Sequence, residues 1–205
     1  MSFGWSGQIL RVDLSNRKSS TEPTEPYTQS FIGGRGISVK IMYDEVGPEI
    51  SPFDPGNRLL LGAGVLGGTP APSSSRTKVT SMSPFGLLTS AGLGGFIGAE
   101  IKQAGYDNII IEGKSDKPVY LYIHNDSVEF KDATHLRGKN TWETQQIIKE
   151  EMGGSVHSMC IGPGGENLVS FGCILTGRGS AAARGGLGAI MGSKNLKAIE
   201  GRIPA

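Results

Sequence analysis

The sequence predicts an α+β fold that is rich in strands, with two similar sheets, mixed or antiparallel, and a few short helices. Apolar strand-like segments separated by glycine turns recur along the 205 residues, whereas the helical stretches are short. The chain also carries two similar series of strand, glycine loop, helix and strand. We therefore expect one domain over residues 1–205, with two pseudo-symmetric halves at about 1–115 and 116–205.

The strand predictions rest on alternating or continuously apolar runs bounded by turn residues. The run GQILRVDLS alternates apolar and polar positions and then meets NRK, which is a hairpin signal. Further strands are expected in RLLLGAG, RTKVTS, NIIIEG, VYLYIH, HSMCIG, LVSFGCIL and LKAIEG. Their number makes strands the dominant element of the fold.

The helix predictions rest on capping residues and glycine stops. NTWETQQIIKEEMGG has Asn140 as its N-cap, Glu143 to close a capping box, and the pair Gly153 and Gly154 as its stop. FIGAEIKQAG predicts a short helix that ends at Gly105, and SFIGGRGISVKIMYDEV predicts a glycine-rich entry into another. None of the intervening segments has the composition of an interdomain linker.

The two halves carry similar glycine loops. GGFIGA leads to a strand that ends IEGK, and GGLGA leads to a strand that ends IEGR. Upstream of each loop lies a strand that ends in a glycine turn, LLGAG in the first half and CIGPG in the second. A duplicated unit presents two similar loops, which suit a ligand with two similar ends.

The loops combine small residues with arginines. Arg76 follows SSS in the first half, and Arg178 and Arg184 lie within GRGSAAARGGLGAIMG in the second. Uncovered backbone amides near a helix N-terminus bind phosphate, and arginine adds charge-assisted hydrogen bonds. A formal net charge of +1 gives no overall attraction to nucleic acid or an anionic membrane, so any anion site is local. The combination predicts a phosphorylated ligand.

Two known phosphate-binding motifs compete for the second loop. A Walker loop fails because GSK carries its serine and lysine in the wrong order and Leu187 replaces the first glycine. The dinucleotide fingerprint fits Gly177, Gly179 and Ala182, with Glu200 following about 20 residues later. Because the helix that it should open contains interior glycines, a nicotinamide-dependent enzyme is the weaker alternative.

Most other polar residues have structural interpretations. Two cysteines are too few for a disulfide framework or a metal site, and the three histidines share no metal-ligand spacing. Glu112 and Glu200, both at strand ends, could form an acid pair but are more simply structural. Arg35 in GGRG is either structural or a third anion contact. These residues are Cys160, Cys173, His124, His135, His157, Glu112, Glu200 and Arg35.

The N-terminal sequence MSFGWSGQILRVDL has neither the basic nor the apolar region of a secretory signal. No apolar run approaches the roughly 20 residues of a membrane-spanning helix. We therefore expect a soluble, cytoplasmic protein with no membrane or nucleic-acid partner.

The whole chain resembles the N-terminal domain of aldehyde ferredoxin oxidoreductase. The blocks that carry the resemblance are GWSGQILRVDLS, GGRG, GNRLLLGAGVLGGTPAPSSSRTKVTSMSP, GGFIGAEIKQAGYDNIIIEGKSDKPVYLYI, IGPGGENLVSFGCIL and ARGGLGAIMGSKNLKAI. The resemblance implies a largely β domain of two similar sheets, on which a tungsten, sometimes molybdenum, bis-pyranopterin cofactor lies. It also implies that a magnesium ion links the two phosphates of this cofactor.

The resemblance assigns cofactor contacts to the first loop. Arg76 matches a cofactor-contacting arginine of the family pattern. The family run ANSGG appears here as AGLGG, so Gly92 stands where an asparagine is expected and leaves backbone contacts only. Leu93, Gly94 and Gly95 complete this loop, and Gly94 matches directly.

The second loop departs further from the family pattern. The family run RAAGRGG appears as SAAARGG, in which Arg184 is kept, Ser180 replaces the first arginine and Ala183 replaces a glycine. Main-chain carbonyls at Gly92 and Ala181 correspond to the magnesium contacts that the resemblance implies. Arg178 could replace the missing guanidinium.

The resemblance also implies partners outside this sequence. Family members are longer, and their downstream part supplies a four-cysteine iron–sulfur cluster, further pterin contacts and acid–base residues. Two cysteines cannot hold a [4Fe–4S] cluster, so we expect it only from a downstream region or a partner subunit. The implied activity is oxidation of a small aldehyde with ferredoxin as acceptor, with no catalytic residue in this chain and no activity in isolation. A homodimer and a non-catalytic pterin or nucleotide carrier remain alternatives.

Overall fold

Two six-stranded sheets form the framework of the described chain. The computed structural model describes residues 4–124, 127–153 and 156–202. The first sheet contains β1 (Gln8–Asp13), β2 (Lys18–Pro23), β3 (Leu59–Ala63), β4 (Thr77–Met82), β5 (Leu88–Leu93) and β6 (Tyr106–Glu112). The second contains β7 (Val119–His124), β8 (Ser127–Asp132), β9 (Val156–Cys160), β10 (Ile174–Thr176), β11 (Ser180–Ala182) and β12 (Leu196–Arg202).

The helices are short and connect these strands. They are α1 (Glu25–Thr28), α2 (Arg35–Glu45), α3 (Ile97–Gln103), α4 (Thr141–Met152), α5 (Pro163–Glu166) and α6 (Leu187–Ser193), with a 3₁₀ turn, η1 (Thr134–Leu136). None of the helices in the described ranges is long and apolar enough to cross a membrane.

Both sheets have the same topology. Their strand orders are β2-β1-β6-β3-β4-β5 and β8-β7-β12-β9-β10-β11, so each strand of the first sheet has a counterpart in the second. Only β1 with β6 and β7 with β12 pair in parallel among the described strands, and all other pairs are antiparallel. The predicted α+β fold with two similar mixed sheets is confirmed.

A shared bulge fixes which residues of the halves are equivalent. The parallel ladder skips Asp107 at the start of β6 and Lys197 at the start of β12. Counting from this bulge, Ile110 corresponds to Glu200, and Ile111 corresponds to Gly201. The sequence match between IEGK and IEGR is therefore out of register by two positions, and the two carboxylates at strand ends are not equivalent. The interpretation was wrong because α3 and α6, like β6 and β12, have equal lengths, whereas the letters match only with a gap.

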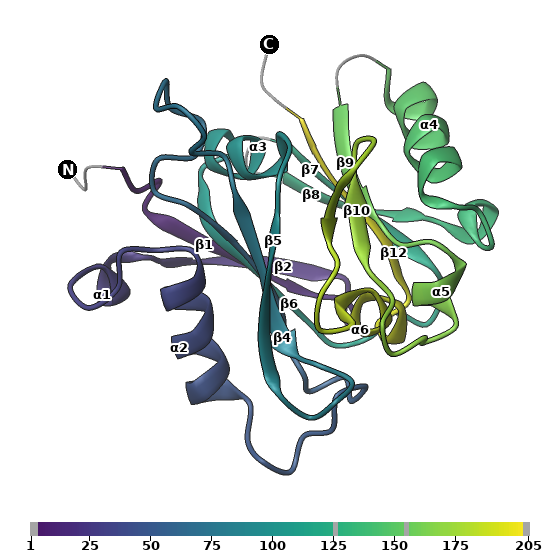
Figure 1. Ribbon diagram of the computed structural model, residues 1–205, viewed down its shortest axis with the longest axis horizontal. Helices are drawn as coiled ribbons and strands as arrows, with labels where there is room; N and C mark the ends of the chain where they lie inside the picture. Colours follow the sequence, from purple (N-terminus) through teal and green to yellow (C-terminus); the bar gives the residue numbers. More distant parts are fainter. Residues whose placement is uncertain (1–3, 125–126, 154–155, 203–205) are drawn as a thin grey trace.

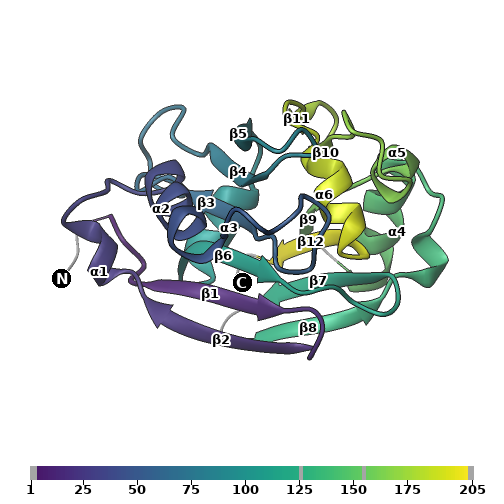
Figure 2. The same cartoon turned by 90° about the horizontal axis from the view of Figure 1, so that it is seen from below.

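The core lies between the sheets, where α3 and α6 are sandwiched (Figures 1 and 2). Ile97 and Ile101 of α3 and Leu187 and Ile190 of α6 belong to one apolar cluster that includes inward-facing residues of both sheets. Helix α2 covers the outer face of the first sheet, and α4 covers the outer face of the second. The layers are therefore α2, the first sheet, the helices α3 and α6, the second sheet, and α4.

The capping analysis of the strongest helix is confirmed. The Asn140 side chain accepts hydrogen bonds from the amides of Trp142 and Glu143, and the Glu143 carboxylate accepts from the Asn140 amide. Helix α4 ends at Met152 with Gly153 as its C-cap, and Gly154 lies outside the described residues.

The strand predicted over LVSFGCIL is wrong for its first part. Only Ile174–Thr176 forms β10, whereas Leu168 and Phe171 lie in an exposed turn, with Phe171 77 % exposed. The apolar letters therefore mark surface side chains rather than a buried run. Strands β5, β8 and β11 escaped prediction because edge strands with polar or small residues are stabilised by ladder hydrogen bonds rather than by an apolar pattern.

Candidate functional site

The two glycine loops meet where the edge strands β5 and β11 lie beside each other (Figure 2). A Cβ built on Gly94 would lie 2.9 Å from the hydroxyl oxygen of Ser180, and one on Gly95 would lie 3.2 Å from Cγ2 of Thr176. From the other side, a Cβ on Gly185 would overlap the Thr89 side chain. The structure thus brings the predicted loops together, and glycines make this close approach sterically feasible.

Two cations lie side by side next to Gly92. Arg76 directly precedes β4, and Lys78 pairs in register with Gly92 of β5. A Cβ at Gly92 would lie 2.9 Å from an Arg76 guanidinium nitrogen and 3.5 Å from the Lys78 ammonium. In the described part of the chain, neither side chain hydrogen-bonds or pairs with a carboxylate. Adjacent like charges without a counterion are typical of a site for an external anion.

Lys78 is a candidate site residue that the sequence analysis missed. Its signal lies in the RTKVTS strand, where Arg76 and Lys78 are two positions apart and so share one face of an extended segment. The lysine was not assigned because only the arginine matched the family pattern.

The second loop presents backbone and exposed side chains. Ser180 and Ala181 belong to β11, the edge strand, and both are partly exposed. Ala183 and Arg184 are exposed and follow this strand, and Arg184 makes no hydrogen bond or ion pair within the described ranges. Because edge strands leave one row of backbone amides and carbonyls unpaired, this loop can offer main-chain groups to a ligand.

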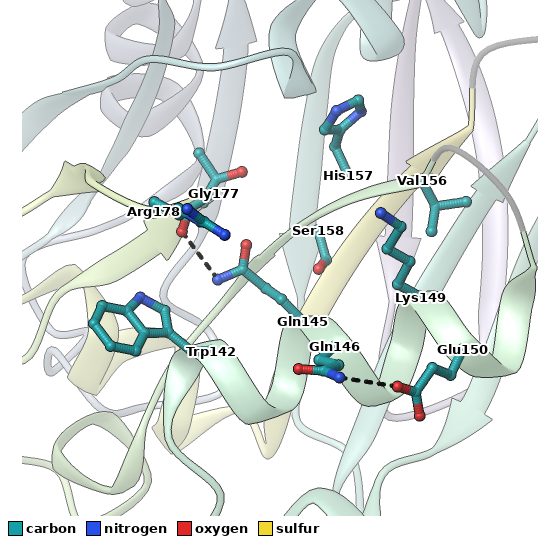
Figure 3. Close-up of a pocket in the computed structure, with 11 residues that line it drawn as sticks. Trp142, Gln145, Gln146, Lys149, Glu150, Val156, His157, Ser158, Gly177 and Arg178 are labelled. Carbon is teal, nitrogen blue, oxygen red and sulfur yellow. Dashed lines mark hydrogen bonds between the residues drawn. The ribbon is translucent and has the colours of Figure 1, made fainter.

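Arg178 lies in a cavity of its own rather than between the two loops. This cavity, of about 1,030 Å³, is lined by α4, β9 and the β10–β11 turn, and includes Trp142, Lys149, His157 and Arg178 (Figure 3). It adjoins the first loop through Thr176, which lines the cavity and faces Gly95. The suggestion that Arg178 replaces the missing guanidinium stays a prediction.

The residues of the dinucleotide fingerprint do not form the strand-to-helix junction that this motif requires. Gly177 and Gly179 form the turn of the β10–β11 hairpin, and Ala182 ends β11 rather than opening a helix. A dinucleotide fold needs a parallel strand that runs directly into a helix at this motif. The nicotinamide alternative is therefore wrong for this loop.

The described residues contain no cluster of three or more histidine, cysteine or carboxylate side chains that could hold a metal ion. Cys160 is buried, and burial raises the pKa of its thiol to about 12, so it is neither a nucleophile nor a ready ligand.

The geometry defines a class of protein: a duplicated β-rich domain in which two glycine loops meet beside Arg76 and Lys78. The comparisons with known proteins identify the family. The chain matches the model of the aldehyde ferredoxin oxidoreductase N-terminal domain over residues 9–202, and it belongs to this family.

Two relatives from Pyrococcus furiosus illustrate the similarity. A tungsten-containing aldehyde ferredoxin oxidoreductase of Pyrococcus furiosus is 44 % identical over 96 % of this chain and 33 % of its own length. A WOR-like subunit of an aliphatic sulfonate oxidoreductase from the same organism is 38 % identical over 96 % of this chain and 34 % of its own. The chain thus spans about a third of the length of these relatives.

A solved structure has nearly the same fold. It is the active site complex BamBC of benzoyl coenzyme A reductase with 1,5-dienoyl-CoA, with a TM-score of 0.96 and 46 % identity. The match covers 98 % of this chain and 31 % of that one. The sheet arrangement is therefore common to an aromatic acyl-CoA reductase complex and to this chain.

Proposed function

We propose that this chain holds one side of a metal bis-pyranopterin cofactor in a larger oxidoreductase that oxidises aldehydes to carboxylic acids. The similarity to tungsten-containing enzymes of three Pyrococcus species supports tungsten as the metal. The downstream region of the protein, or a partner subunit, would supply the iron–sulfur cluster and the remaining walls of the site. Ferredoxin would be the electron acceptor.

The observation that carries this proposal is the cation pair beside Gly92. Arg76 and Lys78 approach each other over a position that has no side chain, without a carboxylate partner among the described residues. Their mutual repulsion is relieved when an anion lies between them, because each can donate charge-assisted hydrogen bonds. A phosphate group has the charge and the oxygen atoms for this role.

The donor set fits a cofactor with two phosphorylated ends. Arg76 and Lys78 would hold phosphate at the first loop, and Arg184 and Ser180 would face the second pterin. Main-chain carbonyls of Gly92 and Ala181 would contact magnesium, while the small residues let the backbone approach the ligand. When bound, the metal would supply two-electron redox chemistry at the substrate carbonyl.

Elemental analysis of the full-length protein tests the proposal. It is purified without oxygen from cells given tungstate and molybdate, and metal and phosphate per chain are measured in wild type, Arg76→Ala, Lys78→Ala and the double variant. Losing one charge-assisted contact costs about 1.5–3 kcal/mol, so each single variant should bind the cofactor at least about tenfold more weakly. The exposed Arg137→Ala, outside both loops, is the matched control and should keep wild-type metal content.

Unchanged metal and phosphate in the Arg76→Ala, Lys78→Ala double variant would contradict the proposal. Folding of each variant is checked by circular dichroism, so that loss of cofactor is separated from loss of structure. Gly92→Ala is a second probe, because its added methyl would lie 2.9 Å from the Arg76 guanidinium and displace it.

A reductive activity is the second candidate. The benzoyl coenzyme A reductase complex is 46 % identical, as similar as the aldehyde oxidoreductases at 44–46 %. Identity therefore does not separate the two reactions. Dye reduction with aldehydes, set against dye oxidation or reduction with aromatic acyl-CoA thioesters, assigns the direction and the substrate.

A further inference from the structure

A buried carboxylate lies beneath a histidine at the edge of the second sheet. Glu100 of α3 is 0 % exposed, and its Oε1 lies 2.5 Å from Nδ1 of His157 on β9. The second carboxylate oxygen, Oε2, is buried without a hydrogen-bond partner in the described residues. An unsatisfied buried carboxylate is costly, so its retention needs an explanation beyond packing.

The fold makes room for this carboxylate. Gly201 of β12 pairs in register with His157, and a Cβ built on Gly201 would lie 2.9 Å from Glu100 Cβ and 3.0 Å from Oε2. Any side chain at position 201 would therefore push Glu100 away from His157. The three residues form one arrangement, in which the glycine provides the space, the glutamate the charge and the histidine the hydrogen bond.

The other half of the molecule shows that the fold does not need this arrangement. By the shared bulge and equal helix lengths, Glu100 corresponds to Ile190, Gly201 to Ile111, and His157 to Leu59. The three counterparts are all fully buried and belong to the central apolar cluster. The three equivalent positions thus hold aliphatic residues in one half, and a glutamate, a histidine and a glycine in the other.

The pair reaches a large cavity through the histidine. His157 has 35 % of its side chain exposed and lines the cavity of about 1,030 Å³ beneath α4 (Figure 3). The cavity forms where β10 ends, because β10 pairs with β9 only at Met159 and Cys160 and leaves β9 uncovered near His157. The imidazole also stacks on Phe96, with ring centroids 4.7 Å apart. Phe96 directly follows the first glycine loop, so the pair lies between that loop and the cavity.

We infer that Glu100 and His157 form a proton-accepting pair that opens through the imidazole to the cavity beneath α4. With the Nδ1 proton donated to the Glu100 carboxylate, Nε2 is the proton acceptor, and it makes no other hydrogen bond in the described structure. A proton taken up at Nε2 gives an imidazolium held by the carboxylate, and it leaves to water in the cavity.

The proposed reaction needs such an acceptor, and in this respect the inference rests on the proposed function. Oxidation of an aldehyde to a carboxylic acid consumes one water molecule and releases two electrons and two protons. The electrons leave to one-electron carriers, the pair takes up one of the two protons, and the other passes to water. Burial raises the pKa of Glu100 to about 7, opposed by the hydrogen bond and charge of His157, so the pair can exchange protons near neutral pH.

Several charged groups surround the pair and contribute to the electrostatic potential around it. They are Glu200 of β12, Lys149 and Glu150 of α4, and Arg178 of the β10–β11 turn. The nearest other cation on α3, Lys102, is paired with Asp107. Because the cavity cations outnumber its carboxylate, the proton of the imidazolium is released to water rather than passed to a second acid.

The test is the pH dependence of turnover in the full-length, metal-loaded enzyme. Wild type should lose activity below a midpoint near pH 7, where the pair is already protonated. Glu100→Gln and His157→Gln should lower kcat by about 100-fold, change KM little, and lose this acidic limb. His135→Gln removes an exposed histidine that pairs with Glu151 instead of Glu100, and should keep both the limb and kcat. Metal content per chain is matched in all four proteins.

An acidic limb that persists in both Glu100→Gln and His157→Gln, with kcat within about twofold of wild type, would overturn the inference and leave the pair a structural contact. His157→Gln keeps a donor to Glu100 and a partly exposed position, so it serves if Glu100→Gln fails to fold.

A wild-type enzyme that oxidises no aldehyde would sink the proposed function and not, by itself, the pair. The pair is then tested by carbethoxylation of His157 with diethyl pyrocarbonate, followed by peptide mass spectrometry over pH. The rate of this reaction at a fixed pH should differ by about threefold or more between wild type and Glu100→Gln, because the hydrogen bond between Nδ1 and the carboxylate is gone. An unchanged rate would overturn the pairing itself.

Discussion

The two halves of this protein share a topology but not a set of interactions. At the shared bulge the first half has Asp107, which accepts hydrogen bonds from the amides of Ser6 and Gly7 and pairs with Lys102. The second half has Lys197 there, which pairs with Glu166 and donates to the Lys139 carbonyl. Opposite charges thus serve the same backbone feature. The bulge and the ladder define the fold, and any residue that finds buried partners can occupy the position.

The helix that precedes each bulge gives a second contrast. Ala104 ends α3, whereas its counterpart Lys194 is 1 % exposed and donates to the carbonyls of Pro55, Asn57 and Gly113. These carbonyls belong to the first half, so the lysine links the halves where the alanine does not. At the residue that follows the helix, hydrogen bonds between the halves are therefore made by the lysine of the second copy and not by the alanine of the first.

The largest expected effect comes from removing that link. Lys194→Ala removes the ammonium donor from three carbonyls, of which only that of Pro55 also accepts from the Gly113 amide, and empties a buried space. It should lower the free energy of unfolding by about 3 kcal/mol or more. Urea denaturation followed by circular dichroism measures it. The exposed Lys117→Ala is the matched control and should stay within about 0.5 kcal/mol of wild type. A loss below 1 kcal/mol in Lys194→Ala would mean that water replaces the lysine at little cost.

The equivalent helical glycines should differ in their tolerance of alanine. A Cβ on Gly188 would lie 2.6–2.8 Å from backbone atoms of Cys173, whereas one on Gly98 would mainly meet the Thr77 side chain, which can rotate. We expect Gly188→Ala to destabilise by about 3 kcal/mol and Gly98→Ala by about 1 kcal/mol, since overpacking costs more against a fixed backbone. Thermal denaturation of the two variants gives the order. The reverse order would show that the halves do not relax as the contacts indicate.

The buried Glu200 should make stability depend on pH. It corresponds to Ile110, has no hydrogen-bond partner for either oxygen in the described residues, and burial followed by repulsion from Glu100 raises its pKa to about 8. A pKa raised above its unfolded value of 4.5 means that the folded state binds the proton more tightly. The stability that this proton binding contributes to the folded state is therefore complete below about pH 4.5 and is lost as the pH rises through about 8.

Replacing Glu200 by the isoleucine of the other half sharpens this comparison. Glu200→Ile should stabilise the protein by about 2 kcal/mol at pH 8, with little effect at pH 4.5, because it removes a buried charge without a partner. Denaturant titrations at both pH values test it, and Glu112→Ile, at a half-exposed carboxylate paired with Arg11 and Arg58, serves as a contrast that should destabilise. Equal stability of Glu200→Ile and wild type at pH 8 would mean that the carboxylate is solvated.

The smallest effect concerns the turn after each helix. Gly105 has φ of 92° and Asn195 has φ of 56°, so both copies use the left-handed region at the same place. Asparagine tolerates this region, and a Cβ on Gly105 would meet nothing within 4 Å. Gly105→Asn should therefore change stability by less than about 0.5 kcal/mol, whereas Gly105→Val should cost about 1–2 kcal/mol. Similar losses in both variants would contradict the equivalence of the turns.

The sequence determined the elements whose signals are local. The capping box of Asn140 and Glu143, the buried runs of β3, β6 and β7, and the family blocks all follow from neighbouring residues. The glycine loops and Arg76 were found in the same way, because glycine and arginine motifs can be recognised from the sequence alone. They indicated an anion site without showing how its two parts meet.

Only the tertiary structure decided the rest. The bulges at Asp107 and Lys197 set the register of the halves, and a ladder fixes them between strands that are far apart in sequence. The approach of Glu100 to His157 joins a helix of one half to a strand of the other, and no pattern of letters predicts it. Local propensity specifies which segments become helix or strand, whereas the environment of a buried charge depends on groups that only folding brings within a few ångströms of it.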